Sequence, residues 1–156
     1  MVQEQDQLLA SVFRIAEGQF AVPAAEIQEV VQVGTLTAVH HAPAYVAGIR
    51  NLRGHIVSVI DLGVKLGLGT VRRSAETRVL IVNCNDELIG LMVEAVDDTV
   101  FVDPNAVSSA PPFTRGLDPS VTRGIYHLGG RLVTLLDQNS ILQLEITVQT
   151  STGPNA

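Results

Sequence analysis

A fifteen-residue pattern occurs twice in the chain, and this repeat limits the possible folds more than any other feature of the sequence. The first copy is GIRNLRGHIVSVIDL, residues 48–62, and the second is GIYHLGGRLVTLLDQ, residues 124–138. At an offset of 76 the two copies are identical at six positions and similar at four more. Repetition of this kind predicts one structural unit that is used twice.

The shared positions are those that a strand pair and its turn would need. The identical pairs are Gly48/Gly124, Ile49/Ile125, Leu52/Leu128, Gly54/Gly130, Val57/Val133 and Asp61/Asp137. We interpret the glycines as positions that need a positive φ or a close backbone approach. The two aspartates follow equivalent strands, and we expect them to cap the short helices that come next.

A second match, at an offset of 69, precedes each copy of the pattern. It aligns Val12/Ile81, Ile15/Cys84, Glu17/Asp86, Phe20/Ile89, Val22/Leu91 and Ile27/Val96. Each half is therefore predicted to contain a hairpin, a short helical turn (residues 24–29 in the first half), one or two middle strands and a second hairpin-like pair. The offset grows by seven residues between the two matches, and we assign the extra residues to the Pro- and Gly-containing segment 108–119.

Short strands with tight turns favour closed barrels, which leave no free sheet edges. The apolar residues, 46% of the chain, are mostly Val, Ile, Leu and Ala, and branched side chains pack well on strands. We predict an all-β fold of two small five-stranded barrels side by side, with short helical turns. The domain would span 8–147, with barrels at about 8–68 and 77–144. The sequence leaves open whether strands are exchanged between the halves. Residues 1–7 and 148–156 are expected to be flexible tails.

The charge and cysteine content exclude several classes of protein. A net charge of −6 argues against a nucleic-acid partner, because binding to phosphates needs a basic face. No apolar run approaches the ~18 residues of a membrane span, so we expect no direct membrane insertion. The polar start MVQEQDQ does not resemble a signal peptide. A single cysteine, Cys84, fits a reducing compartment, and we predict a cytoplasmic protein.

The sequence contains no pattern that indicates an enzyme. There is no G-x-S-x-G motif, phosphate loop or metal-spaced Cys/His cluster. His40 and His41 are adjacent, and on a strand they would point to opposite faces. We therefore predict no catalytic residue, no cofactor and no metal ion. The alternative of a small β-barrel enzyme or ligand carrier would need polar groups that converge in a cavity, and the chain offers mostly Val and Leu.

Residues 42–62, APAYVAGIRNLRGHIVSVIDL, resemble the CheW-like chemotaxis coupling proteins, together with EIQEVV before them and ETRVLIVNCNDELIGLMVEAV after them. The resemblance extends from about Leu8 to Leu144. It implies two SH3-like barrels and no catalysis. It also implies an adaptor that binds the cytoplasmic tip of chemoreceptors (methyl-accepting chemotaxis proteins) and the regulatory domain of the histidine kinase CheA. Such a protein is expected to be monomeric when free and to be recruited to membrane-associated receptor arrays.

The resemblance also implies which residues bind the receptor or the kinase. They are Ile27, Glu29, Gly48 and Arg53. Two positions depart from the family pattern: Ser58 stands where a proline is common, and Gly63 where an arginine is frequent. These departures leave open a second reading, a CheW paralogue that serves another chemosensory or pilus-motility array.

Of Glu29 and Arg53, only Glu29 has a residue of the same charge at the aligned position of the second half. The aligned residues of the second half are Asp98 and Gly129, so the acid is kept and the arginine is not. We hypothesise that Arg53 reaches Glu29 across the barrel and leaves a charged patch in an apolar groove, a task that suits the planar guanidinium. The alternative is a solvated surface pair that contributes ~0–1 kcal/mol.

Overall fold

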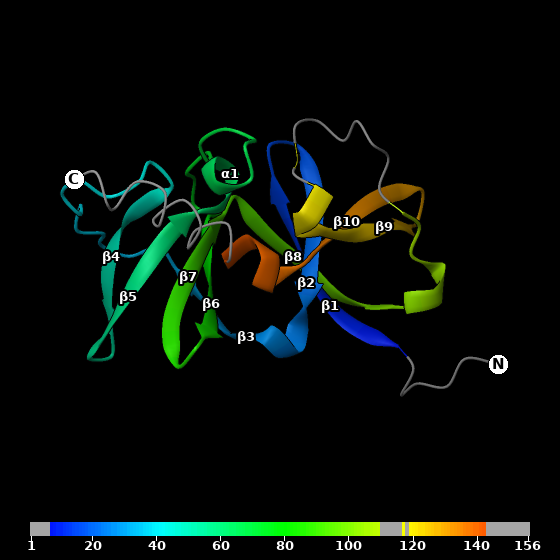
Figure 1. Ribbon diagram of the computed structural model, residues 1–156, viewed down its shortest axis with the longest axis horizontal. Helices are drawn as coiled ribbons and strands as arrows, with labels where there is room; N and C mark the ends of the chain where they lie inside the picture. The colour runs from blue at the N-terminus through cyan, green and yellow to red at the C-terminus, as the bar shows by residue number, and fades with distance from the viewer. Residues whose placement is uncertain (1–6, 110–116, 118, 143–156) are drawn as a thin grey trace.

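The computed structural model describes residues 7–109, 117 and 119–142, and this part of the chain is built mainly from strands. Figure 1 shows two rolled sheets side by side. The strands are β1 (Leu8–Ile15), β2 (Gly18–Pro23), β3 (Ile27–Gln32), β4 (Val46–Leu52), β5 (His55–Asp61), β6 (Arg78–Cys84), β7 (Glu87–Val93), β8 (Ala95–Val102), β9 (Thr122–Leu128) and β10 (Arg131–Leu136). The predicted all-β class with two five-stranded barrels is confirmed.

The helical segments are short and lie between strands. They are η2 (Ala24–Glu26), α1 (Leu62–Lys65), η3 (Pro104–Ala106) and η4 (Pro119–Val121), and residues 138–142 are also helical. The helical turn predicted over 24–29 is too long, because β3 already begins at Ile27. Asp61 and Asp137 act as the predicted caps. The Asp61 carboxylate accepts a hydrogen bond from Val64 N at 3.1 Å, and that of Asp137 accepts one from Asn139 N at 3.1 Å.

The strands of the two halves are exchanged between the sheets. One sheet has the order β3-β6-β7-β5-β4 and comes from the middle of the chain; we call it barrel M. The other has the order β8-β1-β2-β10-β9 and combines both ends of the described chain; we call it barrel T. Each barrel therefore takes a hairpin from one half and three strands from the other. The exchange that the sequence left open is present, and a division at 8–68 and 77–144 does not separate the two sheets.

Each barrel is closed by an isolated bridge between the two ends of its strand order. In barrel M, Thr37, which follows β3, pairs with Ile49 of β4, and in barrel T, Ser108, which follows β8, pairs with Ile125 of β9. In each bridge the two N–H···O=C hydrogen bonds are 2.8–2.9 Å long. We call the line along which β3 and β4 meet the seam of barrel M, and the line between β8 and β9 the seam of barrel T.

The glycine that precedes each closing residue makes this bridge possible. Gly48 has φ +152° and Gly124 has φ +141°. A Cβ atom on Gly48 would lie 2.8 Å from Thr37 O, and one on Gly124 would lie 2.4 Å from Ser108 O. The repeated glycine is therefore explained by the close approach of the closing segment, as expected from the sequence.

The apolar core continues from the inside of barrel M into the junction between the barrels. Val57, Val79 and Leu91 belong to the same buried cluster as Phe13 and Ile15 of β1. The other face of β1 contributes Ala10 and Val12 to a second cluster inside barrel T. Because β1 buries side chains on both faces, it connects the two cores. Full burial of each such Val, Leu or Ile contributes roughly 1.5–3 kcal/mol.

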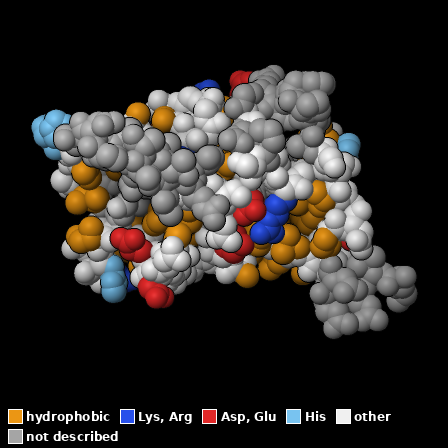
Figure 2. Space-filling model, viewed as in Figure 1, with side chains coloured by type: hydrophobic (Ala, Val, Ile, Leu, Met, Phe, Trp, Pro, Cys, Tyr) orange, Lys and Arg blue, Asp and Glu red, His pale blue; other side chains and the backbone are white. Residues whose placement is uncertain are grey.

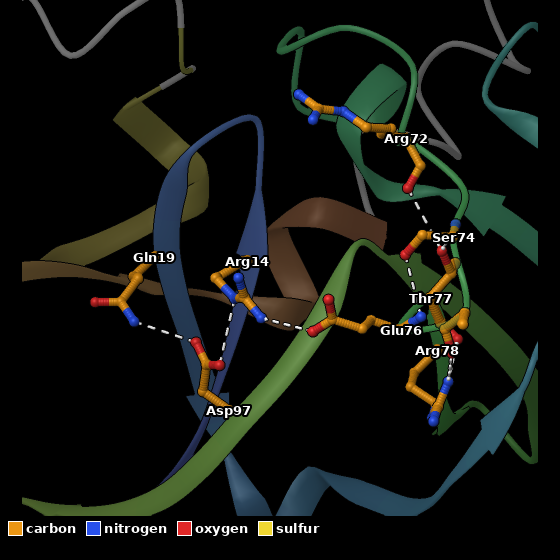
Figure 3. Close-up of polar contacts among 9 residues, drawn as sticks. Arg14, Gln19, Arg72, Ser74, Glu76, Thr77, Arg78 and Asp97 are labelled. Carbon is orange, nitrogen blue, oxygen red and sulfur yellow. Dashed lines mark hydrogen bonds and ion pairs between the residues drawn. The ribbon is translucent and has the colours of Figure 1, made fainter.

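Charged side chains hold the connector after α1 against barrel T (Figure 3). Arg14 of β1 forms ion pairs with Glu76 at 3.1 Å and with Asp97 of β8 at 3.3 Å. Glu94 accepts hydrogen bonds from Ala16 N and from Arg72 N, both at 3.2 Å. The first of these groups belongs to the β1–β2 turn and the second to the connector, so the connector is fixed to the rim of the other barrel.

Candidate partner-binding site

The candidate site begins at the hairpin turn between β4 and β5. Leu52 pairs with His55, which leaves Arg53 and Gly54 as the two turn residues. Their φ angles are +50° and +87°, and two left-handed residues in sequence are typical of a type I′ turn. The side chain of Asn51 supports the turn by accepting a hydrogen bond from Gly54 N at 2.8 Å. The turn therefore needs left-handed geometry at Arg53, although arginine does not favour it.

Arg53 extends from this turn to β3, where it forms an ion pair with Glu29. The contact that was hypothesised from the sequence is present. The Arg53 side chain is 67% exposed and the Glu29 side chain is 35% exposed, so the pair lies at the surface. A surface pair of this kind contributes ~0–1 kcal/mol to stability.

Glu29 lies on the side of β3 that turns toward the barrel. Burial alternates along β3, with Ile27, Glu29 and Val31 half-buried and their neighbours exposed. Ile27 and Val31 both pack against the core cluster. The carboxylate of Glu29 is thus framed by apolar side chains, and Arg53 covers it from the opposite strand pair.

A second arginine bridges the same seam. Arg50 of β4 donates from Nη1 to the carbonyl oxygen of Gln32 and, at 3.3 Å, to that of Val33. These carbonyls lie at the C-terminal end of β3, which is an edge strand in the order of barrel M. The seam is therefore joined by the backbone at Thr37 and by arginine side chains on either side of Val31.

The four residues predicted for partner binding occupy different places in this arrangement. Glu29 and Arg53 are in contact, and Ile27 lies on the same side of β3 as Glu29. Gly48 is buried in β4 beside Thr37, where it serves the closure of the barrel. The structure thus brings Ile27, Glu29 and Arg53 together and places Gly48 in the supporting seam.

Two exposed apolar residues near this site were not among the predicted residues. Ile56 is 64% exposed and lies opposite Asn51 in the hairpin that carries Arg53, and Val30, next to Glu29, is 43% exposed. A signal for Ile56 was present in the sequence, because an apolar residue beside the inward Val57 must point outward on a strand. Figure 2 shows hydrophobic side chains at the surface of both barrels on the face it presents.

The two departures from the family pattern have different surroundings. Ser58 lies on the outer face of β5 and is exposed. Gly63 is buried in α1, where a Cβ atom would lie 2.2 Å from Gly69 O. The connector passes so close to α1 that no side chain fits at residue 63, which accounts for the absence of an arginine there.

Glu26 supplies a perturbed acid at the junction of the barrels. It lies in η2, directly before β3, and Arg123 of β9 is 3.8 Å away. Burial raises the pKa of Glu26, the Asp137 carboxylate raises it further, and the Arg123 guanidinium opposes the shift. Figure 2 shows acidic and basic side chains together near the centre of the face, over the region where the barrels meet.

Residues 7–109, 117 and 119–142 contain neither a candidate metal site nor a candidate membrane-spanning helix. No group of three or more His, Cys, Asp or Glu side chains in these residues is placed to hold a metal ion. His40 and His41 do not lie on a strand, so the condition under which their side chains would point to opposite faces is not met. Both lie in a turn, His41 has φ +61°, and their rings meet edge to face at 4.6 Å. No helix in this part of the chain has the length and apolar character that crossing a membrane requires.

Comparison with known proteins gives a consistent result. The model of the family described as "CheW-like domain" matches residues 10–145. The chain is 31% identical to the chemotaxis protein CheW of Helicobacter pylori over 84% of this chain and 79% of that protein. It is 27% identical to CheW of Rhizobium meliloti over 85% of this chain and 86% of that protein. The crystal structure of the scaffolding protein TtCheW from Thermoanaerobacter tengcongensis superimposes with a TM-score of 0.78 at 30% identity, and 85% of each chain is covered.

Proposed function

The chain belongs to the CheW-like domain family, and on this basis we propose that it is a non-enzymatic adaptor that couples chemoreceptors to the histidine kinase CheA. In this proposal the cytoplasmic tip of a receptor binds at the Ile27, Glu29 and Arg53 site, and the regulatory domain of CheA binds elsewhere on the barrels. The protein would be cytoplasmic and recruited to membrane-associated arrays. The adaptor would act without chemistry: because it holds the receptor and the kinase together, a conformational change of the receptor can alter the activity of the kinase.

The observation that carries the proposal is the energetic imbalance at Arg53. A non-glycine residue in the left-handed region costs roughly 1–2 kcal/mol. The exposed ion pair with Glu29 returns ~0–1 kcal/mol. Stability alone therefore does not favour arginine at this turn, and the equivalent turn of barrel T has Gly129 with the same geometry. An exposed guanidinium, on a hairpin that also carries the exposed Ile56, provides both the polar and the apolar groups that a binding surface needs.

The test is co-sedimentation of the purified chain with receptor-tip fragments and with CheA, each alone and both together. We expect the chain to join both, and we expect Arg53→Ala to lose the receptor while it keeps the kinase. Arg73→Ala is the matched control, since Arg73 is an exposed arginine of the connector. If the unmodified chain joins neither partner, the adaptor proposal is wrong. If Arg53→Ala binds the receptor normally, the site is wrong.

The array that the chain would serve is a separate part of the proposal. Protein FrzA of Myxococcus xanthus is 27% identical to this chain over 84 residues, so relatives are not all named CheW. The exposed Ser58 and the closed surroundings of Gly63 are the places where partner choice would differ. Repeating the co-sedimentation with receptor tips from separate arrays distinguishes a chemotaxis coupler from a paralogue that serves another array.

A further inference from the structure

Barrel T contains an open pocket where barrel M carries the candidate site. The pocket has a volume of about 400 Å³. It is lined by Val12, Gln19, Val96, Asp97, Asp98, Val100, Leu128 and Arg131. At the offsets of 69 and 76 these positions correspond to residues of barrel M, namely Ile81, Leu88, Ile27, Gln28, Glu29, Val31, Leu52 and His55. The pocket is therefore the counterpart of the site that contains Ile27 and Glu29.

The two places differ at the turn residue. In barrel M, Arg53 covers the acid Glu29. In barrel T the corresponding acid is Asp98, and the corresponding turn residue is Gly129, which has no side chain to cover it. The backbone is the same, since φ is +50° at Arg53 and +54° at Gly129. The pocket thus lacks the side chain that Arg53 supplies at the equivalent position of barrel M.

Asp98 differs from its neighbour Asp97 in its partners. Asp97 is engaged by Arg14 Nε at 3.3 Å and by Gln19 Nε2 at 3.1 Å (Figure 3). Asp98 is exposed, and its side chain makes no hydrogen bond or ion pair with any residue of the described chain. Arg131 also lines the pocket, but within the described residues it forms no ion pair of 4.0 Å or less with either aspartate. One carboxylate of the pocket is therefore available to a cation from outside.

We propose that this pocket binds an arginine side chain of a partner protein, which takes the place that Arg53 occupies in barrel M. A cation is favoured by the carboxylate of Asp98, which is unpaired among the described residues, whereas Asp97 is already paired with Arg14. The apolar walls formed by Val96, Val100 and Leu128 favour arginine over lysine, since a guanidinium is less strongly hydrated than an ammonium. Its stem can also lie along apolar side chains. This proposal does not depend on the proposed coupling role, because the pocket lies in barrel T and the proposed receptor site lies in barrel M.

The first experiment titrates the full-length, isotope-labelled chain with N-acetyl-arginine amide and follows the backbone amide signals by NMR. The neutral isostere N-acetyl-citrulline amide is the control ligand. We expect saturable shifts at Asp98, Val100 and Leu128 with the arginine compound and none with citrulline. Asp98→Asn should weaken the binding about fivefold, the factor that one exposed ion pair provides. Absence of saturable shifts at these residues, or equal binding by Asp98→Asn, would overturn the proposal.

The second experiment supplies the arginine from the chain itself. A Cβ atom at Gly129 meets no other atom within 4 Å, and Arg53 demonstrates that arginine is accommodated in this turn. In Gly129→Arg the new side chain should pair with Asp98 and abolish the shifts caused by N-acetyl-arginine amide. Gly129→Ala, which adds backbone strain without a guanidinium, should bind the compound like the unmodified chain. If Gly129→Arg still binds it with unchanged affinity, the pocket is not an arginine site.

Discussion

Arg53 and Gly129 occupy the same place in two equivalent hairpin turns, and their φ angles of +50° and +54° are almost equal. The backbone of both turns is therefore the one that glycine prefers. Barrel T uses glycine there, whereas barrel M keeps an arginine that is 67% exposed and paired with Glu29. The turn therefore needs only the left-handed backbone, and the arginine side chain adds the ion pair with Glu29.

Replacement of Arg53 by glycine should separate stability from binding. Arg53→Gly and Arg53→Ala both remove the guanidinium, but only glycine relieves the left-handed backbone. We expect Arg53→Gly to be more stable than Arg53→Ala by about 1 kcal/mol, a difference of roughly 2–4 °C in melting temperature. Both variants should lose receptor-tip binding to the same extent. Thermal unfolding and co-sedimentation measure the two effects, and a receptor-binding Arg53→Gly variant would contradict the role given to the arginine.

The glycines beside the closing bridges should not tolerate alanine. Gly48→Ala places a methyl group 2.8 Å from Thr37 O, and Gly124→Ala places one 2.4 Å from Ser108 O. Because the neighbours are backbone atoms of the barrel closure, we expect each variant to lose about 2–3 kcal/mol of unfolding free energy. Urea unfolding gives the values. Gly69→Ala is the control, since Gly69 also has a positive φ but no atom within 4 Å of its Cβ position. A loss as large in the control would mean that φ strain, and not closure, is responsible.

Asp61 should matter more to stability than its counterpart Asp137. Asp61 is 5% exposed, and its carboxylate accepts hydrogen bonds from Val64 N and from the buried Val71 N. Asp61→Ala leaves both donors without this partner, so we expect a loss of about 2–4 kcal/mol, against about 1 kcal/mol for Asp137→Ala. Urea unfolding of both variants tests the order. Equal losses would show that the contact with the connector contributes nothing beyond the cap.

Glu26 should make the protein less stable as the pH rises. Burial raises the pKa of Glu26 in the folded chain, so the unfolded chain releases this proton first. Stability is then lost as the pH rises from the ordinary pKa of a glutamate to the raised one, and the loss persists at neutral pH. Glu26→Gln should therefore raise the melting temperature at neutral pH and have no such effect in acid. Glu87→Gln, at an exposed glutamate of β7, controls for removal of one charge, and an equal gain in that variant would refute the local explanation.

The pattern of the sequence was sufficient to predict the class of the fold and the repeated unit. Gly48, Gly124, Asp61 and Asp137 carry the same constraint in both halves, so a repeated residue identified a repeated contact. The pairing of Arg53 with Glu29 could be predicted for the opposite reason, because the second half has no arginine at the position equivalent to Arg53. Similarity therefore indicated the scaffold, and difference indicated the candidate site.

Other features leave no such trace in the sequence. β1 pairs with β2 of its own half and with β8 of the other half, and the second pairing is decided by long-range contacts that the apolar pattern of β1 does not reveal. Arg50 binds backbone carbonyls, which every residue has, so no partner residue marks its role. The turn at His40 and His41 depends on the left-handed backbone of His41, a conformation that histidine does not require and the sequence therefore does not indicate.

The exchange of strands has a consequence for any half-length version of this chain. A break in the connector, near Arg72, would leave β1 to β5 in one piece and β6 to β10 in the other, and neither piece contains all five strands of a barrel. Two such pieces complete both barrels only by intertwining, each lending its first hairpin to the other. The molecule is thus equivalent to an interlocked dimer whose subunits have been joined end to end.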